Sequence, residues 1–187
     1  MLSRQTTSAG KYTIIMDNPS DTIKATSDSA TATSDNTEFL ASLQPDAFDA
    51  VIVAGGDFPT HPVPLAVMER ALMLVACDSA GEELVRRGYK PTAIVGDCDS
   101  MSAEFRAEHA DIIYKVEEQD YNDLTKATRF CTERGCRRIA YVGATGKRED
   151  HTLGNISLLD FYRRELHVDA LMFTDYGVFI PAAGETA

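Results

Sequence analysis

Three short segments carry the residues of this chain whose types and spacing suit chemistry. They are residues 96–100 (GDCDS), 119–126 (QDYNDLTK) and 143–151 (GATGKREDH). The first two are acidic clusters of the kind that hold Mg²⁺, and the third is a glycine turn followed by a cation and a further aspartate. Together they indicate a site that transfers phosphoryl groups.

Asp97 and Asp99 lie two positions apart in the first segment. In extended backbone such residues point to the same side, so both carboxylates can reach one hard cation. Mg²⁺ prefers a few carboxylates together with phosphate oxygens and water, and Ser100 can contact a phosphate or cap the next segment. The alternative is a solvated acidic turn that caps a helix, but the strand predicted to end at Gly96 favours the metal-binding interpretation.

Asp123 and Lys126 lie three apart at the start of a predicted helix and therefore share one of its faces. Asp120 or Asn122 suits the N-cap of that helix. Taken alone, this segment is a capped helix with a surface ion pair worth well under ~1 kcal/mol. Beside the other two segments, we favour a role in which a carboxylate contacts metal or acceptor and Lys126 contacts phosphate.

The third segment follows a predicted strand and precedes a predicted helix. Backbone N–H groups of residues 143–146 and the dipole of the helix can cradle a phosphate. Arg148 can neutralise charge on the transferred group, and Asp150 can orient or deprotonate an acceptor hydroxyl. The segment is not a Walker A loop. The alternative is a plain β-turn in which His151 and Asn155 satisfy local hydrogen bonds, and for His151 we favour that local role.

Short apolar runs alternate with helical patterns between residues 50 and 173. The predicted strands are 50–54, 74–77, 93–95, 112–116, 138–142 and 170–173. The predicted helices are 63–72, 80–87, 122–134 and a segment that runs from the glycine turn to about residue 161. This alternation predicts an α/β fold with a parallel sheet and helices on both faces.

Ligands of such sheets bind beyond the carboxyl ends of the strands. Asp57, Asp78, Asp97 and the turn at Gly143 each follow a predicted strand directly. Four strand ends therefore deliver polar groups to one edge of the sheet. For Asp78 the alternative of a simple helix cap stays open, and residues 55–57 form a glycine-rich turn that can approach a nucleotide.

The two ends of the chain differ from the middle. We predict a poorly defined segment over 1–46, in which residues 17–38 are rich in Ser, Thr, Asp and Ala and form a mobile stretch or loop. A short strand at 12–16 is possible before it. The α/β domain is predicted over 47–177. Residues 178–187 suggest a strand and the start of a hairpin that belongs to a further, truncated domain.

The overall composition of the chain argues against several classes of function. A net charge of −11 over 187 residues offers no basic face for nucleic acid and fits a metal-dependent nucleotide site. No apolar run approaches the roughly 20 residues of a membrane span, and the first residues lack the apolar core of a signal peptide. We therefore expect no membrane partner and a cytoplasmic location. The four cysteines show no CxxC spacing, which makes zinc binding unlikely.

From about residue 50 to 176 the chain resembles the thiamine pyrophosphokinase (thiamine diphosphokinase) family. The likeness consists of five motifs in family order: AGGDFP, CDSAGEEL, GDCDS, QDYNDLTKA and GATGKREDHTLGN. The resemblance implies Mg²⁺-dependent transfer of a pyrophosphoryl group from ATP to the hydroxyethyl oxygen of thiamine, with release of AMP. It also implies that a thiamine-binding β-sandwich begins at residue 178. A homodimer with thiamine bound between subunits is a further implication.

The same motifs imply roles for individual residues. Around metal and substrate the resemblance implies Asp78, Asp97, Asp99, Asp120 and Asp150, of which the first three are the metal ligands. For the phosphates and nucleotide it implies Ser100, Asp123, Lys126, Gly143, Thr145, Gly146 and Arg148. The residues expected to take part directly in the reaction are Asp97, Asp99, Asp120, Asp150 and Arg148.

The chain departs from the family pattern at three positions. Cys98 replaces a usual aromatic residue, Asn122 replaces a common Thr or Ser, and Lys147 replaces a frequent Gly and adds a cation near the phosphates. Two other functions stay open: a related pyrophosphokinase that acts on another alcohol, such as a hydroxymethyl pterin, and a nucleotide- or thiamine-binding module without turnover.

Overall fold

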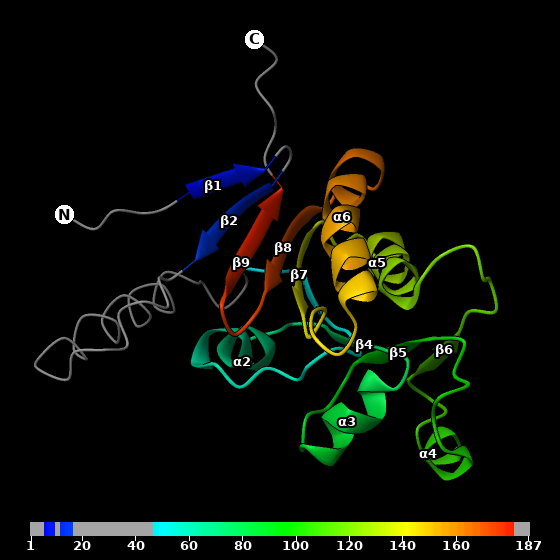
Figure 1. Ribbon diagram of the computed structural model, residues 1–187. Coiled ribbons are helices and arrows are strands. Elements are labelled where there is room, and N and C mark those ends of the chain that lie inside the picture. Colours follow the sequence, from blue (N-terminus) through cyan, green and yellow to red (C-terminus); the bar gives the residue numbers. More distant parts are fainter. Residues whose placement is uncertain (1–5, 10–11, 17–46, 182–187) are drawn as a thin grey trace, which may run out of the picture.

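The computed structural model describes residues 6–9, 12–16 and 47–181. Within them the chain forms one nine-stranded sheet with helices on both faces (Figure 1). The strands are β1 (Thr6–Ala9), β2 (Tyr12–Met16), β3 (Ala50–Val53), β4 (Leu74–Cys77), β5 (Ala93–Gly96), β6 (Ile113–Lys115), β7 (Arg138–Val142), β8 (Asp169–Phe173) and β9 (Gly177–Pro181). The helices are α2 (Pro62–Glu69), α3 (Ala80–Arg86), α4 (Ala103–Glu108), α5 (Asp123–Glu133) and α6 (Glu149–Glu165).

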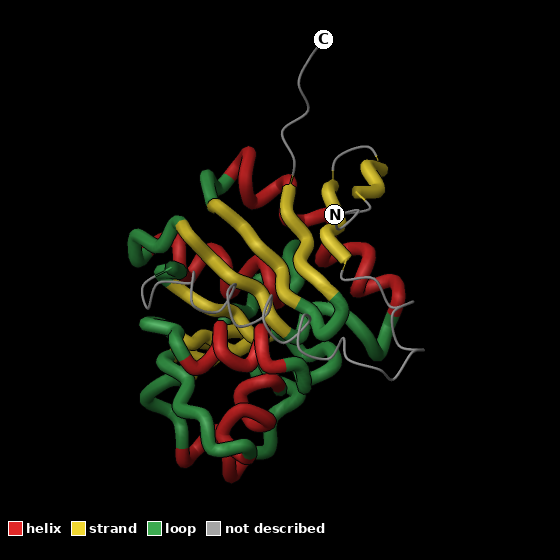
Figure 2. Tube along the Cα trace, turned by 90° about the vertical axis from the view of Figure 1, so that its left-hand side faces the viewer, coloured by secondary structure: helices red, strands yellow, loops and turns green. Residues whose placement is uncertain are grey.

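The strand order is β1-β2-β9-β8-β7-β3-β4-β5-β6. The strands from β8 to β6 are parallel, whereas β9, β2 and β1 extend the sheet in antiparallel fashion. In Figure 2 the strands run side by side through the middle of the molecule. The predicted α/β fold is confirmed, and each of the six strands predicted between residues 50 and 173 is present. The sequence pattern missed α4 and β1.

The core consists of two apolar layers, one on each face of the parallel sheet. Successive strand residues alternate between them, as the two-residue period of a strand requires. In β3, Ala50 and Ile52 pack with α5 and α6, whereas Val51 and Val53 pack with α2, α3 and α4. Burying each large aliphatic side chain contributes about 1.5–3 kcal/mol, so these two layers hold the sheet between its helices.

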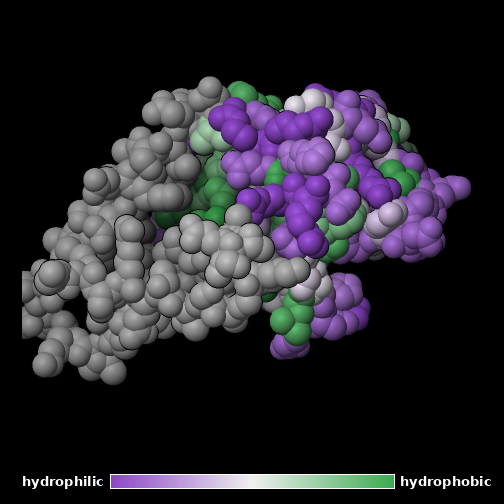
Figure 3. All heavy atoms as spheres, turned by 90° about the horizontal axis from the view of Figure 1, so that it is seen from above, coloured by the Kyte–Doolittle hydropathy of each residue, from purple (hydrophilic) through white to green (hydrophobic). Residues whose placement is uncertain are grey.

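The face in Figure 3 is largely hydrophilic, with small separate hydrophobic areas among its described residues. Within residues 47–181, the large apolar side chains that are exposed are Leu72, Tyr114, Tyr121, Leu153 and Tyr176. Among the described residues, no helix is both long and apolar enough to cross a bilayer.

The last described strand, β9, continues the main sheet. Val178 pairs with Phe173 of β8 on one side and with Ile15 of β2 on the other. The strands predicted at 12–16 and from 178 are therefore present. The start of a β-sandwich at residue 178 and the other domain boundaries stay predictions, because residues 182–187 and the Ser/Thr-rich stretch 17–38 lie outside the described residues.

Asp49 connects the beginning of β3 to the beginning of β7 through hydrogen bonds. Its carboxylate accepts hydrogen bonds from the backbone N–H groups of Arg137 (2.8 Å) and Arg138 (2.9 Å), and from the Arg138 guanidinium at 2.9 Å. Burial raises the pKa of Asp49, but these hydrogen bonds outweigh burial and hold the pKa below its usual range. The charged carboxylate therefore contributes to stability.

We expect Asp49→Asn to lower the free energy of unfolding by about 1 kcal/mol near neutral pH, because partial exposure screens the ion pair. A depressed folded-state pKa means that the contribution is present above the unfolded-state pKa of about 3.9 and is lost as pH falls through the folded-state pKa. The difference in the free energy of unfolding between wild type and Asp49→Asn should thus be constant above about pH 5 and shrink below about pH 4.

Chemical denaturation at several pH values checks this expectation. The exposed Asp111→Asn is the control and should leave unfolding unchanged. A difference between wild type and Asp49→Asn that persists undiminished at the lowest pH would contradict it.

Candidate active site

Four neighbouring strands end at the same edge of the sheet. In the order β7, β3, β4 and β5 they are parallel, so their carboxyl ends lie together. They lead into the turn at Gly143, the loop 55–57, Asp78 and Asp97. The predicted convergence of polar groups at one edge of the sheet is confirmed.

Asp78, Asp97 and Asp99, hereafter the acidic triad, lie closest to one another. One carboxylate oxygen of each lies within 4.8 Å of the others. Asp78 is buried, Asp97 is half-buried and Asp99 is exposed. The triad therefore opens from the protein interior to the surface. These are the three residues predicted as metal ligands, and oxygen ligands of this kind suit Mg²⁺.

Asp78 is the most constrained member of the triad. Its backbone has a φ of +41°, which is rare outside glycine. Oδ2 accepts a hydrogen bond from Ser100 Oγ, whereas buried Oδ1 has no hydrogen-bond partner within the described part of the chain. Burial raises the pKa of Asp78, a backbone hydrogen bond from Ser79 offsets part of that rise, and the nearby carboxylates of Asp123, Asp97 and Asp99 raise the pKa further. A buried oxygen without a partner is costly, and a cation at the triad would remove that cost.

Asp97 and Asp99 converge through a turn rather than through extended backbone. Cys98 between them has a φ of +64°, and the Asp99 N–H donates to Asp97 Oδ1 at 3.3 Å. This hydrogen bond, with further help from Gln119 and Lys126, lowers the pKa of Asp97. The prediction that extended backbone brings Asp97 and Asp99 together is therefore wrong, although the two carboxylates do come together.

Gly96 allows the first two members of the triad to approach. A Cβ atom at this position would lie 2.9 Å from Asp78 Cβ and 3.2 Å from Asp78 Cα. The backbone at the end of β5 thus passes directly against Asp78, and the Asp78 N–H donates to Val95 O at 3.0 Å. Any side chain at residue 96 would push the two strand ends apart.

Lys126 is a buried cation beside the triad. Its side chain is 4% exposed, and Nζ donates to Asp123 Oδ1 at 3.2 Å. Lys126 is near enough to Asp97 to help lower the pKa of that carboxyl. The pair is thus not the solvated surface ion pair of the alternative interpretation. A buried lysine with one carboxylate partner and a second carboxylate nearby is suited to hold an anionic ligand at this place.

The N-cap of α5 is Asn122 rather than Asp120. Asn122 Oδ1 accepts from the Thr125 N–H at 3.0 Å. Asp120 lies in the exposed loop before the helix, where its N–H contacts the Glu118 carboxylate. The Asp120 carboxylate makes no hydrogen bond or ion pair with a described residue, so the structure does not join it to the triad. Its role in the site stays a prediction.

The turn of residues 143–147, hereafter the glycine turn, packs against loop 54–57. Gly56 N donates to Gly143 O at 2.7 Å, and Asp57 N donates to Thr145 O at 2.8 Å. Lys147 adds a further link from Nζ to Gly55 O at 2.9 Å. The bonds to Gly143 O and Thr145 O occupy carbonyl oxygens of the turn. Within the described residues, the N–H groups of Thr145 and Lys147 have no acceptor, as an anion-binding turn requires.

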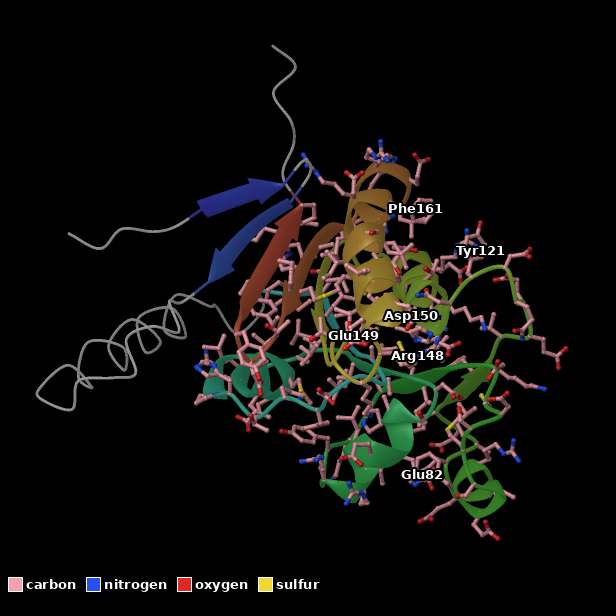
Figure 4. All side chains as sticks on the ribbon, in the orientation of Figure 1. Glu82, Tyr121, Arg148, Glu149, Asp150 and Phe161 are labelled. Carbon is pink, nitrogen blue, oxygen red and sulfur yellow. The ribbon has the colours of Figure 1, made fainter. Side chains whose placement is uncertain are left out.

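Arg148 and Asp150 form an exposed pair at the beginning of α6. Arg148 Nε lies 3.1 Å from Asp150 Oδ1, and Nη2 lies 2.5 Å from Oδ2. The hydrogen bonds from Arg148 lower the pKa of Asp150. Figure 4 shows both side chains with Glu149 at the start of the helix, apart from Tyr121 in the loop before α5. Two predicted site residues thus contact each other, and the neighbouring His151 is exposed.

Residues 65–169, more than half of the chain, match the family model described as the catalytic domain of thiamin pyrophosphokinase. The chain belongs to the thiamine pyrophosphokinase family. It is 33% identical over 113 residues to thiamine pyrophosphokinase of Bacillus subtilis, which covers 58% of this chain and 52% of that protein. It is 36% identical over 88 residues to thiamine pyrophosphokinase 3 of Oryza sativa subsp. japonica, which covers 42% and 33%. The chain thus spans between a third and about half of these relatives.

Solved structures of the family share the fold. Thiamin pyrophosphokinase from Geobacillus thermodenitrificans aligns with a TM-score of 0.54 at 27% identity, over 66% of this chain and 58% of that one. The enzyme from Candida albicans aligns with a TM-score of 0.56 over 68% and 58%, and at 18% identity it supports the fold alone. The family resemblance drawn from the motifs is confirmed.

Two asparagines of the family motifs contact each other, which sequence reasoning missed, whereas a local hydrogen bond of Asn155 to the turn is one that the alternative interpretation expects. Asn155 Nδ2 donates to Ala144 O at 2.8 Å, and Asn122 Nδ2 donates to Asn155 Oδ1 at 3.1 Å. Both residues lie inside the motif segments, but nothing in their spacing indicates that they meet. A single sequence gives no signal for a contact between residues 33 positions apart.

A substitution at Gly56 tests how closely loop 54–57 packs against the glycine turn. A Cβ at this position would lie within 2.5 Å of Gly143 O and closer still to Thr145 O, so the backbone must move. We expect Gly56→Ala to lower the free energy of unfolding by about 1–3 kcal/mol. Chemical denaturation measures this change.

Gly154→Ala is the matched control. Residue 154 is exposed within α6, and its added Cβ meets nothing within 4 Å. This variant should gain up to about 1 kcal/mol from helix propensity. Equal stability of the two alanine variants would contradict the close packing of loop 54–57 on the turn.

Proposed function

We propose that this chain carries the catalytic site of a Mg²⁺-dependent thiamine pyrophosphokinase. The reaction transfers the pyrophosphoryl group of ATP to the hydroxyl of thiamine and gives thiamine diphosphate and AMP. The observation that carries the proposal is the acidic triad, with its unpartnered buried Asp78 Oδ1, at the same sheet edge as the glycine turn. Membership of the family and the names of the relatives support it.

The triad fits a magnesium ion. It offers one carboxylate oxygen from each of three residues within 4.8 Å of one another. One of these residues, Asp78, also has a buried carboxylate oxygen without a hydrogen-bond partner in the described residues. Asp78, Asp97 and Asp99 would hold the metal. When bound, Mg²⁺ neutralises polyphosphate charge and helps to orient the phosphates. Ser100 keeps Asp78 Oδ2 occupied, which leaves Oδ1 for the ion.

The other residues bind and orient the two substrates. N–H groups of the glycine turn hold phosphate oxygens, with Gly143 and Gly146 setting the shape of the turn and Thr145 contributing its N–H group. Lys126, fixed by Asp123, holds charge on the phosphates from the interior side. Arg148 stabilises charge that develops on the transferred group.

The chemical step is an in-line displacement. The thiamine hydroxyl oxygen forms a bond to the β-phosphorus of ATP, while the bond from that phosphorus to the oxygen shared with the α-phosphate breaks. AMP leaves with that oxygen, and the proton of the hydroxyl passes to the Asp150 carboxylate and from there to water. Because the pKa of Asp150 is low, its carboxylate is ionised and suits the role of hydrogen-bond acceptor that orients the hydroxyl. Asp120 is proposed to contact the acceptor from the loop before α5.

The proposed partners are ATP and thiamine, in a cytoplasmic homodimer that uses neither nucleic acid nor membrane. The names of the relatives favour thiamine over another alcohol such as a hydroxymethyl pterin. The decisive experiment incubates the chain with ATP and Mg²⁺, with and without thiamine, and separates AMP from ADP. Thiamine-dependent AMP supports the proposal, whereas ADP would indicate ordinary kinase chemistry and overturn it.

We expect Asp97→Asn to reduce turnover by several orders of magnitude, because it removes a charged ligand from the triad. The fold should persist, since Asp97 is only half-buried. Glu133→Gln, an exposed change at the far end of α5, is the matched control. Steady-state AMP formation and circular dichroism provide the measurements, and near-normal activity of Asp97→Asn would remove this residue from the mechanism.

Arg148→Ala is expected to lower kcat by about 10–1,000-fold, because a cation facing the transferred group is lost. Its thermal midpoint should stay close to that of wild type, since both partners of the Arg148–Asp150 pair are exposed. Arg163→Ala, at the opposite end of α6, removes the same charge without touching the site. Equal turnover of the two variants would show that Arg148 has no catalytic role.

A further inference from the structure

We propose that Asn155 is a positioning residue that fixes the glycine turn relative to the beginning of α5. Its kinetic consequences rest on the function proposed above. Asn155 belongs neither to the triad nor to the turn, and lies half-buried on α6. Its Nδ2 donates to Ala144 O in the turn at 2.8 Å, and its Oδ1 accepts from Asn122 Nδ2 at 3.1 Å. One side chain thus connects the segment after β7 with the N-cap of α5.

The contacts at both ends determine the orientation of this amide. Asn122 Oδ1 is used by the helix end, where it accepts from the N–H of Thr125 (3.0 Å) and from its Oγ1 (2.8 Å). Asn122 therefore presents its Nδ2 to Asn155 and needs an acceptor there. Ala144 O on the other side needs a donor. A side chain at residue 155 must therefore offer an acceptor to Asn122 and a donor to Ala144 O. An asparagine offers both, whereas an ionised aspartate lacks the donor and a leucine lacks both.

The link joins the two parts of the site. Asn122 directly precedes Asp123, the partner of buried Lys126. Ala144 lies between Gly143 and Thr145 in the turn whose N–H groups are proposed to hold the phosphates. In the proposed reaction, Lys126 and the turn hold the same polyphosphate from different elements. Their separation therefore decides whether both can act on it at once.

Apolar packing alone would leave this separation loosely defined. Helices α5 and α6 share the apolar layer that covers one face of the sheet, and nondirectional contacts of that kind tolerate small shifts along a helix. A second polar contact, between Thr125 Oγ1 and Tyr162 OH at 2.8 Å, lies two turns further along α6. The two contacts together define the register of α6 against α5 through directional bonds.

The test compares Asn155→Asp with Thr128→Val. Asn155→Asp keeps the size and the acceptor for Asn122 but loses the donor for Ala144 O. Thr128→Val removes a different buried contact of α5, in which Thr128 Oγ1 lies 3.1 Å from Tyr141 OH of β7. Both should lower the thermal midpoint. Only Asn155→Asp should lower kcat, by about 10–100-fold, and raise the KM for ATP about five-fold, because misplacement of reacting groups costs rate.

A double-mutant cycle tests the link itself. If Asn122 and Asn155 act through one hydrogen bond, Asn122→Ala and Asn155→Ala together should reduce kcat little more than the more severe of the two alone. Losses that multiply would overturn the link. Turnover of Asn155→Asp within two-fold of wild type, with only the thermal midpoint lowered, would overturn the positioning role.

Binding of Mg·ATP separates this inference from the proposed function. A wild-type chain that forms no thiamine-dependent AMP refutes the function, and calorimetric affinity for Mg·ATP then decides the inference. Affinity about five-fold weaker in Asn155→Asp, with Thr128→Val unchanged, supports the link because the turn and Lys126 no longer reach one polyphosphate together. Equal affinity in all three proteins, or no binding by the wild type, overturns it.

Discussion

Repulsion among the carboxylates of the acidic triad is the constraint on which the rest of the site depends. Three carboxylates that can approach within 4.8 Å oppose their own ionisation. The pKa values of the triad shift in opposite directions. Burial raises the pKa of Asp78, whereas the hydrogen bond from the Asp99 N–H lowers the pKa of Asp97. The fold therefore keeps the three carboxylates close together without neutralising their charge. Such a site gains more from a cation than a solvated acidic cluster does.

The sheet supplies the rigidity that this arrangement needs. Asp78 and Gly96 end adjacent parallel strands, and the hydrogen bond from Asp78 N to Val95 O prevents the strand ends from separating. Helix α5 then covers the same strands with its apolar side and keeps Lys126 buried beside the triad. Moving any of these elements would expose the lysine or release the carboxylates, so packing and electrostatics depend on each other here.

Much of this architecture could be predicted because local patterns decide it. The parallel strands are continuous apolar runs, and carboxylates that follow strand ends must gather at one edge. Contacts between distant segments could not be predicted. The burial of Lys126 depends on how α5 lies on the sheet, and the contact between Asn122 and Asn155 depends on the register of two helices. Helix α4 was missed because it is only six residues long and buries Phe105 alone.

The two parts of the site differ in a way that suits their proposed tasks. Lys126 and Asp78 are buried, so their positions are fixed before any ligand arrives. Arg148 and Asp150 are exposed and form an ion pair with each other. Water solvates each of those charges nearly as well as its partner does, so the pair can open at little cost when a substrate offers new partners. A polyphosphate can therefore meet a preformed interior and draw an adaptable pair onto itself from the outside. The glycine turn directly precedes Arg148 in the chain and is linked through Asn155 to the N-cap of α5, so its placement connects the adaptable pair to the preformed interior.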